Sequence, residues 1–237
     1  AVGAGMNPVW AVIAATLNSA ECYRLYGKGA IAPGYDADIA VFDDLKNFNC
    51  AMTFKGGKLV AKEGKALFAA GGKYLPDAVK NTVHVGDIAA DDFKIKLKGK
   101  RANVIRILKD NVVTEKVVRE VESEHGDVKL SGTDLLKLAV VERHHGTGNI
   151  GLGLLEGYGL KNGAISLTIA HDSHNVIVLG DNNADMAAAV AELKRIGGGM
   201  AIAEGGRAYS LSLDIAGLMS SLPAEEYIAQ SEKLHEK

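Results

Sequence analysis

The first residues of the chain follow a helical pattern of apolar and polar positions. Asn7 stands where it can cap a helix whose first residue is a proline, an arrangement that satisfies free N–H groups of the first turn. Asn18, followed three residues later by Glu21, predicts the cap of a second short helix. We expect this helical part to end at Gly27.

From residue 28 the pattern changes to the alternation that is typical of half-buried strands. Gly56-Gly57 predicts the turn of a hairpin. A linker is expected at Gly71-Gly72, before Pro76. The strands expected in this part lie at 38–42, 50–54 and 58–61.

A separate mixed domain is predicted from about residue 76, because strand-like and helix-like stretches follow one another there. The apolar run at 135–141 fits either a buried strand or a helix. The fold class that the whole pattern predicts is α+β. Strands are expected in this part at 93–97, 102–108, 112–121, 164–170, 176–179, 200–203 and 208–213, and helices at 185–196 and 223–234.

Composition narrows the classes of function. The 237 residues are 47% hydrophobic and 24% charged, which is typical of a globular protein. A net charge of −2 and 5% aromatic residues argue against nucleic-acid and membrane partners. No apolar run reaches the ~18–20 residues of a membrane helix. Two separate cysteines, Cys22 and Cys50, form no zinc or redox motif and fit a reducing cytoplasm.

The densest polar cluster of the chain runs from His171 to Asn175, between two apolar stretches. It contains His171, Asp172, Ser173, His174 and Asn175, which together can transfer protons, bind a polar ligand or contribute to a metal site. The alternative is a polar turn whose side chains cap their own backbone. The sequence leaves both interpretations open.

A second cluster, Glu142-Arg143-His144-His145, precedes a G-x-G-x-x-G sequence. A dinucleotide site requires a helix directly after such glycines, and the following residues are themselves too rich in glycine for a helix. We therefore interpret these glycines as turn residues. The sequence contains no H-x-H pair, no G-x-S-x-G and no Walker loop.

Two stretches resemble known families. The sequence G-x-I-x-P-G-x-x-A-D-x-x-V from Gly29 to Val41 resembles the end of amidohydrolase-superfamily enzymes, where the last barrel helix leads into a small β-sandwich. The stretch from Val141 to Gly180 and the glycines from 197 to 206 resemble the C-terminal domain of bacterial adenine deaminases. The superfamily pattern is matched here by Gly29, Ile31, Pro33, Gly34, Ala37, Asp38 and Val41.

This resemblance implies three parts in the chain. Residues 1–27 would be the terminal helices of an amidohydrolase barrel, 28–75 a β-sandwich segment, and 76–237 a mixed α/β domain of the adenine deaminase type. It also implies that the chain starts inside an element, behind a missing barrel of about 250 residues.

The family implies hydrolysis of adenine to hypoxanthine and ammonia by divalent metal ions (Mn, Fe or Zn) held in that barrel. None of the family's metal ligands is in this sequence, so we expect the chain alone to bind no metal and to be inactive. We further expect a cytoplasmic homo-oligomer with adenine as the substrate of the complete enzyme, and no nucleic-acid or membrane partner.

The candidate residues for contact with the barrel mouth are the two polar clusters. In this hypothesis they close the active site or bind the purine; alternatively, they satisfy one another and brace an interface. Two rival functions stay open: a stand-alone, non-catalytic purine-binding or oligomerisation module, and a metal enzyme centred on His171 and His174. A piece of a larger enzyme would expose Val9, Trp10 and Ile13. The candidates that line the site are His171, Asp172, His174, Asn175, Glu142, Arg143 and Asn149.

Overall fold

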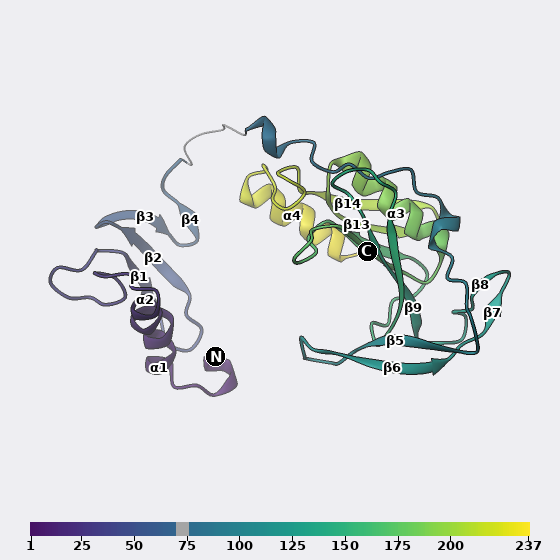
Figure 1. The fold of residues 1–237 in the computed structure, drawn as a ribbon. Helices are drawn as coiled ribbons and strands as arrows, with labels where there is room; N and C mark the ends of the chain where they lie inside the picture. Colours follow the sequence, from purple (N-terminus) through teal and green to yellow (C-terminus); the bar gives the residue numbers. More distant parts are fainter. Residues whose placement is uncertain (70–75) are drawn as a thin grey trace. The chain divides into compact units, whose positions relative to one another are not determined.

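A computed structural model describes residues 1–69 and 76–237. Its internal contacts divide the chain into an N-terminal unit, Ala1–Lys73, and a C-terminal unit, Tyr74–Lys237 (Figure 1). The linker predicted at Gly71-Gly72 lies outside the described residues. Along the described ranges, no helix is long and apolar enough to cross a membrane.

The N-terminal unit begins with a 3-10 turn, Val2–Ala4, and the predicted helix α1, Pro8–Ile13. The Asn7 side chain caps α1 as expected, accepting a hydrogen bond from the Val9 N–H at 2.9 Å. The second cap predicted at Asn18 is wrong, because the chain continues without interruption through a π-helical turn, Ala14–Asn18, into α2, Ser19–Cys22. Asn18 has helical backbone angles and makes no capping bond, and α2 ends well before Gly27.

The strands predicted in the N-terminal unit are confirmed. They form one antiparallel sheet in the order β1-β2-β3-β4, and Gly56 and Gly57 make the turn between its two central strands with positive φ angles of 55° and 75°. Asp38 fixes the start of the sheet, because its carboxylate accepts hydrogen bonds from Lys28, Lys55 and the Gly56 N–H. The strands are β1 (Ile39–Phe42), β2 (Cys50–Lys55), β3 (Lys58–Lys62) and β4 (Lys65–Ala66).

The C-terminal unit is built on an eight-stranded sheet in the order β14-β13-β11-β12-β9-β10-β5-β6. Every neighbouring pair is antiparallel except β10 and β5, which are parallel. The run 135–141, left open between strand and helix, is the central strand β9. The strands are β5 (Arg101–Ile107), β6 (Thr114–Glu120), β9 (Leu135–Val141), β10 (Ile150–Glu156), β11 (Ala164–Leu167), β12 (Val176–Gly180), β13 (Gly199–Glu204) and β14 (Arg207–Ser212), beside a separate hairpin of β7 (Ser123–Glu124) and β8 (Asp127–Val128).

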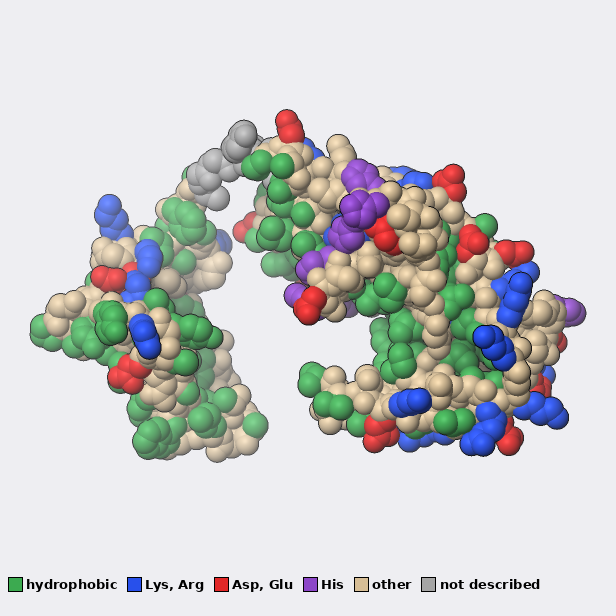
Figure 2. Space-filling view, in the orientation of Figure 1, with side chains coloured by type: hydrophobic (Ala, Val, Ile, Leu, Met, Phe, Trp, Pro, Cys, Tyr) green, Lys and Arg blue, Asp and Glu red, His purple; other side chains and the backbone are tan. Residues whose placement is uncertain are grey.

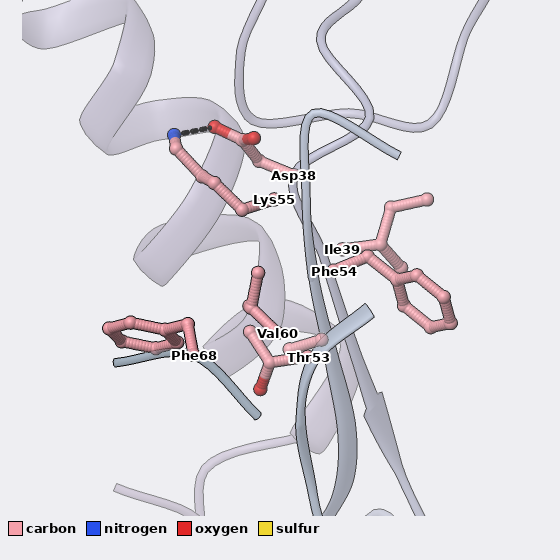
Figure 3. A pocket seen from close by; sticks show the side chains of 8 residues that line it. Asp38, Ile39, Thr53, Phe54, Lys55, Val60 and Phe68 are labelled. Atoms are coloured by element: carbon pink, nitrogen blue, oxygen red, sulfur yellow. Dashed lines mark hydrogen bonds and ion pairs between the residues drawn. The ribbon is translucent and has the colours of Figure 1, made fainter. Parts of the chain in front are cut away.

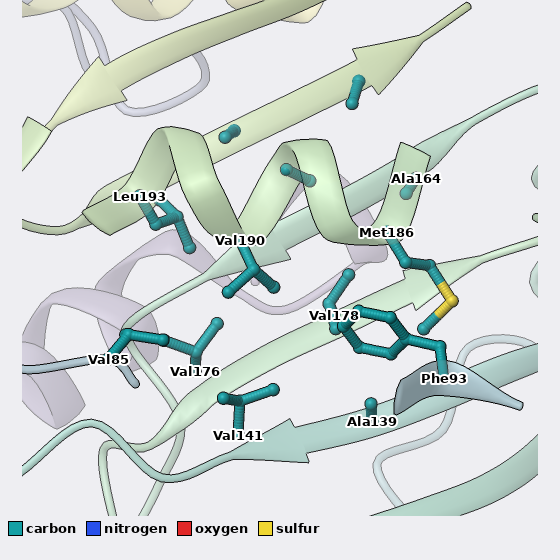
Figure 4. Packing of buried hydrophobic residues seen from close by; sticks show 13 residues of the cluster. Val85, Phe93, Ala139, Val141, Ala164, Val176, Val178, Met186, Val190 and Leu193 are labelled. Carbon is teal, nitrogen blue, oxygen red and sulfur yellow. The ribbon is translucent and has the colours of Figure 1, made fainter. Parts of the chain in front are cut away.

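The main core lies between this sheet and helix α3, Asn183–Ile196 (Figure 4). The Asn182 side chain caps α3 through the Asp185 N–H at 2.8 Å, and Gly197 ends it in the left-handed conformation. Met186 and Leu193 on the helix are fully buried. The remaining helices are short 3-10 turns at Asp77–Val79 and Ala90–Phe93, and α4, Ala224–His235.

Two sequence predictions fail in this unit. Residues 93–97 are not a strand: they leave the 3-10 turn at Phe93, which is fully buried, and continue as irregular backbone whose Ile95 N–H donates to Asp127 at 2.8 Å. The alternating apolar side chains Ile95 and Leu97 pack on the core, although this segment pairs with no strand of the described chain. Conversely, the glycine-rich stretch 150–156 is strand β10, because it pairs with β9 and β5 on its two sides.

Candidate functional site

The two polar clusters of the sequence meet where the neighbouring inner strands β9 and β12 of the large sheet end and begin. β9 and β12 are antiparallel neighbours, and Val141 at the end of β9 lies opposite Val176 at the start of β12. The residues that follow β9 and those that precede β12 are therefore side by side. Figure 2 shows histidine side chains gathered on one part of this unit. His84 lies at the same end of β9, since its N–H donates to the Arg143 carbonyl at 2.7 Å.

Arg143 is the buried centre of this arrangement, with only 2% of its surface exposed. Its Nε donates to the carbonyl oxygen of His174, and its Nη2 donates to the carbonyl of Ala216 at 3.2 Å. Its backbone N–H donates to the Asn175 side-chain oxygen at 3.3 Å. Burial lowers the pKa of the guanidinium, and Nη1 has no acceptor among the described residues. Arg143 therefore holds three segments together rather than lining an open site.

Glu142 organises the turn that follows β9. One carboxylate oxygen accepts hydrogen bonds from the N–H groups of His144 and His145, and the other accepts from the N–H and the hydroxyl of Thr147, both at 3.0 Å. These bonds, above all that from the Thr147 N–H, lower the pKa of Glu142 to about 2. A carboxylate with this set of bonds stays ionised and is a poor proton acceptor at neutral pH.

The loop before β12 presents its first residues to solvent. The His171 side chain is 79% exposed and Asp172 is fully exposed, with 3.8 Å between His171 Nδ1 and the nearer Asp172 oxygen. His174 is half-buried, has a positive φ of 51°, and carries a buried Nδ1 without a partner in the described chain. Asn149 is exposed, and its carbonyl accepts from the Glu142 N–H at 3.0 Å.

The structure also brings in residues that were not among the candidates. His144 Nε2 lies 2.8 Å from the carbonyl oxygen of Ser173, which connects the two clusters directly. Thr168 is fully buried, and its hydroxyl bonds both the Gly199 N–H and the Gly217 carbonyl. The segment around Gly217 supplies a carbonyl to Arg143 and lies far away in the sequence, so no local pattern could reveal it.

These side chains do not fit a metal ion. The rings of His171 and His174 meet edge to face with centroids 5.1 Å apart, and Asp172 points into solvent. Among the residues that the structure describes, no three histidine, cysteine, aspartate or glutamate side chains are placed to hold a metal. No helix follows the G-x-G-x-x-G sequence, which excludes a dinucleotide site there. Gly146 and Gly148 have positive φ angles of 64° and 73° and lie in the loop before β10, whereas Gly151 lies inside β10, so the interpretation as turn residues is wrong for this third glycine.

The N-terminal unit carries an apolar pocket on its sheet (Figure 3). Ile39, Phe54, Val60 and Phe68 contribute apolar side chains to it, and the ion pair of Lys55 with Asp38 stands at one end. Most of the lining is apolar, with Thr53 and the Lys55–Asp38 pair as its polar groups, so the pocket offers mainly an apolar contact surface.

Helix α1 also exposes apolar side chains. Trp10 is 63% exposed and Val9 is 55% exposed, whereas Ile13 is half-buried. Large exposed apolar side chains so close together are typical of interaction surfaces.

Comparison with known proteins decides the family. Residues 111–237, more than half of the chain, match the Adenine deaminase C-terminal domain family. The chain belongs to the Adenine deaminase C-terminal domain family. Residues 1–60 match the Amidohydrolase family, as their resemblance to that superfamily implied.

Curated relatives match nearly the whole chain. It is 49% identical over 238 residues to Adenine deaminase 2 of Carboxydothermus hydrogenoformans, covering 99% of this chain and 41% of that protein. It is 45% identical over 234 residues to an adenine deaminase of Nitratidesulfovibrio vulgaris, covering 97% and 40%. For an adenine deaminase of Dehalococcoides mccartyi, the identity is 41% over 237 residues, covering 99% and 41%. The chain thus spans about two-fifths of the length of these relatives.

Proposed function

We propose that this chain works as the C-terminal part of an adenine deaminase, an enzyme that hydrolyses adenine to hypoxanthine and ammonia. The observation that carries the proposal is the 49% identity to an adenine deaminase along 99% of the chain, which includes both structural units. We further propose a cytoplasmic location and a homo-oligomeric state. The two free cysteines, Cys22 and Cys50, favour a reducing compartment.

The metal chemistry is proposed to lie outside this chain. A divalent metal, Mn, Fe or Zn, would be held by a barrel that precedes these residues in the complete enzyme and would supply the hydroxide that attacks adenine. The match to the Amidohydrolase family supports a metal-dependent enzyme. Two observations support a metal site elsewhere: the sequence has no H-x-H pair, and the described residues include no group of three histidine, cysteine, aspartate or glutamate side chains placed to hold a metal.

The N-terminal unit is proposed to pack against that barrel. Val9 and Trp10 on α1 form an apolar surface, and the pocket beside Phe68 forms a second one. Burial of such surfaces is favourable by about 25 cal/mol per Å² of apolar area. This exposure favours a part of a larger enzyme over the stand-alone module, which would bury the same side chains.

Within the candidate site, we propose a division of roles. His171, Asp172 and Asn149 have exposed side chains and would face the barrel mouth and the purine. Glu142, Arg143, His174 and Asn175 use their polar groups mainly within the two segments and would position that surface. Carboxylate, imidazole and amide groups match the donors and acceptors on the edge of adenine.

A chimeric enzyme tests this function. Its first part would be the roughly three-fifths of Carboxydothermus Adenine deaminase 2 that this chain does not match, followed by the 237 residues of this chain. We expect the purified chimera to release ammonia from adenine, and the same barrel part without the added chain to lose most of that activity. A chimera that folds and binds metal but leaves adenine unchanged would contradict the proposal.

The stand-alone module makes a different prediction. A purine-binding module would bind adenine without the barrel, and isothermal titration of the isolated chain with adenine would detect heat of binding. We expect no saturable heat, because the exposed His171 and Asp172 side chains form only one side of the proposed site.

A further inference from the structure

Strand β6 forms a free edge of the eight-stranded sheet, where Figure 1 shows it beside β5 at one end of the unit. Antiparallel backbone bonds alternate between the two sides of a strand. The Val121 N–H donates to the Lys100 carbonyl at 2.9 Å, in register with the β5–β6 pairs. The odd-numbered residues of β6 therefore form the backbone hydrogen bonds to β5. The backbone N–H and C=O groups of Lys116, Val118 and Glu120 point away from β5, towards the open side of the strand.

Two of these three residues carry charged side chains that are not paired within the described chain. Lys116 and Glu120 are exposed and form no ion pair with any residue in the described ranges, and Val118 stands midway between them at 44% exposure. The neighbouring Arg119 already has an ion-pair partner, because its Nε lies 2.8 Å from a carboxylate oxygen of Glu156.

We propose that β6 pairs antiparallel with β6 of a second copy of this chain, across a two-fold axis at Val118. Lys116 then lies opposite Glu120 of the partner subunit, and Glu120 lies opposite Lys116 of the partner subunit. Val118 meets the partner subunit's Val118. All three pairs use backbone groups that point outwards, so the sheet continues from one copy into the other without disturbing β5.

The charges of Lys116 and Glu120 favour the register centred on Val118 and a second copy of this chain as the partner. Moving the axis to Val117 would place Lys116 opposite Val118 of the partner subunit and leave the free charges unmatched. Proteins that protect an edge strand use proline, bulges, inward-pointing charge or exposed charged side chains, lysine above all. β6 contains no proline and no bulge, and its free charges are of opposite sign at equal distances from Val118. A two-fold interface requires a surface that is complementary to itself, which this strand provides.

Charge reversal tests the proposal on the 237-residue chain, with sedimentation velocity as the measurement. The unmodified chain is expected to be a dimer. The variants K116E and E120K each place like charges opposite one another, and each is expected to weaken dimerisation about ten-fold or more. The matched control is K161E, which makes the same charge change at an exposed lysine outside β6. Circular dichroism checks that all variants fold alike.

The two single variants should also rescue each other. In an equimolar mixture, the strand with glutamate at both positions 116 and 120 faces the strand with lysine at both positions, so we expect heterodimers about as stable as the original dimer. The double variant K116E/E120K should recover the homodimer for the same reason. The proposal is overturned if the unmodified chain stays monomeric up to about 100 µM, as it would if the edge served a strand of another protein. Single variants that dimerise like K161E, or a mixture that shows no recovery, would overturn it too.

Discussion

The Nε of Arg143 donates a hydrogen bond to the carbonyl oxygen of His174, joining the turn after β9 to the loop before β12. The same guanidinium reaches Ala216, so one buried cation fixes three segments that are distant in sequence. The bond to His174 goes to its backbone, and the side chains of His171 and Asp172 in the same loop are exposed. The shape of the proposed contact surface thus depends on a residue that does not belong to that surface.

Replacement of Arg143 by methionine should destabilise the C-terminal unit. The variant keeps much of the apolar volume but removes the donor that the carbonyls of the half-buried His174 and Ala216 share, at a cost of about 2–4 kcal/mol in the free energy of unfolding. Urea unfolding followed by circular dichroism measures it. The control is Arg101→Met, at an exposed arginine of β5. Equal stabilities of the two variants would show that the Arg143 bonds contribute nothing.

Glu142 should make the stability of this unit depend on pH in the acid range. Its pKa is lowered from an ordinary value near 4.5 to about 2, so its contribution is complete above pH 4.5 and is lost as the pH falls towards 2. The difference in melting temperature between the unmodified chain and Glu142→Gln should therefore shrink on acidification. Glu124→Gln, at an exposed glutamate, is the control. A difference that stays constant over this range would refute the role assigned to the carboxylate.

The hydroxyl of Thr168 should matter more than its methyl group. Thr168→Val preserves the shape of the side chain but leaves the Gly199 N–H and the Gly217 carbonyl unpaired in the core, which costs about 1–3 kcal/mol. Thr168→Ser keeps the hydroxyl and should lose less. Thermal unfolding of the two variants gives the comparison. A serine variant less stable than the valine variant would mean that packing, not hydrogen bonding, dominates at this position.

His171 and Asp172 should affect catalysis without affecting folding. In the chimeric enzyme described above, we expect His171→Ala and Asp172→Asn to lower kcat/KM for adenine at least about ten-fold, with unchanged melting temperatures, because both side chains are exposed. The control is His125→Ala, at an exposed histidine in the β7–β8 turn. Unchanged kinetics in both site variants would remove the proposed contact with the purine and leave these residues a purely structural role.

The sequence predicted most of the regular elements, because strands such as β9 and β12 and helix α3 carry clear apolar patterns with turn residues at their ends. Its errors have physical causes. The glycines of β10 hide a strand whose pairing comes from both neighbours. The segment after Phe93 alternates like a strand although it packs on the core without strand pairing.

The candidate site could be predicted only in its local parts. Two polar clusters were visible, and the antiparallel pairing of β9 with β12 explains why they meet. The role of Arg143 could not be predicted, because its burial depends on the segment at Ala216, more than seventy positions further along the chain. Glu142 was expected only as a residue that lines the site, and its role in the following turn depends on hydrogen bonds that the sequence does not show.

The central claim is that this chain is the part of an adenine deaminase that does not hold the metal. The most direct test incubates the purified 237-residue chain with adenine and, in turn, with Mn²⁺, Fe²⁺ and Zn²⁺, and measures released ammonia beside the chimeric enzyme. We predict ammonia from the chimera and none from the isolated chain with any of the three metals. Ammonia released by the isolated chain at a rate comparable to that of the chimera would contradict the account.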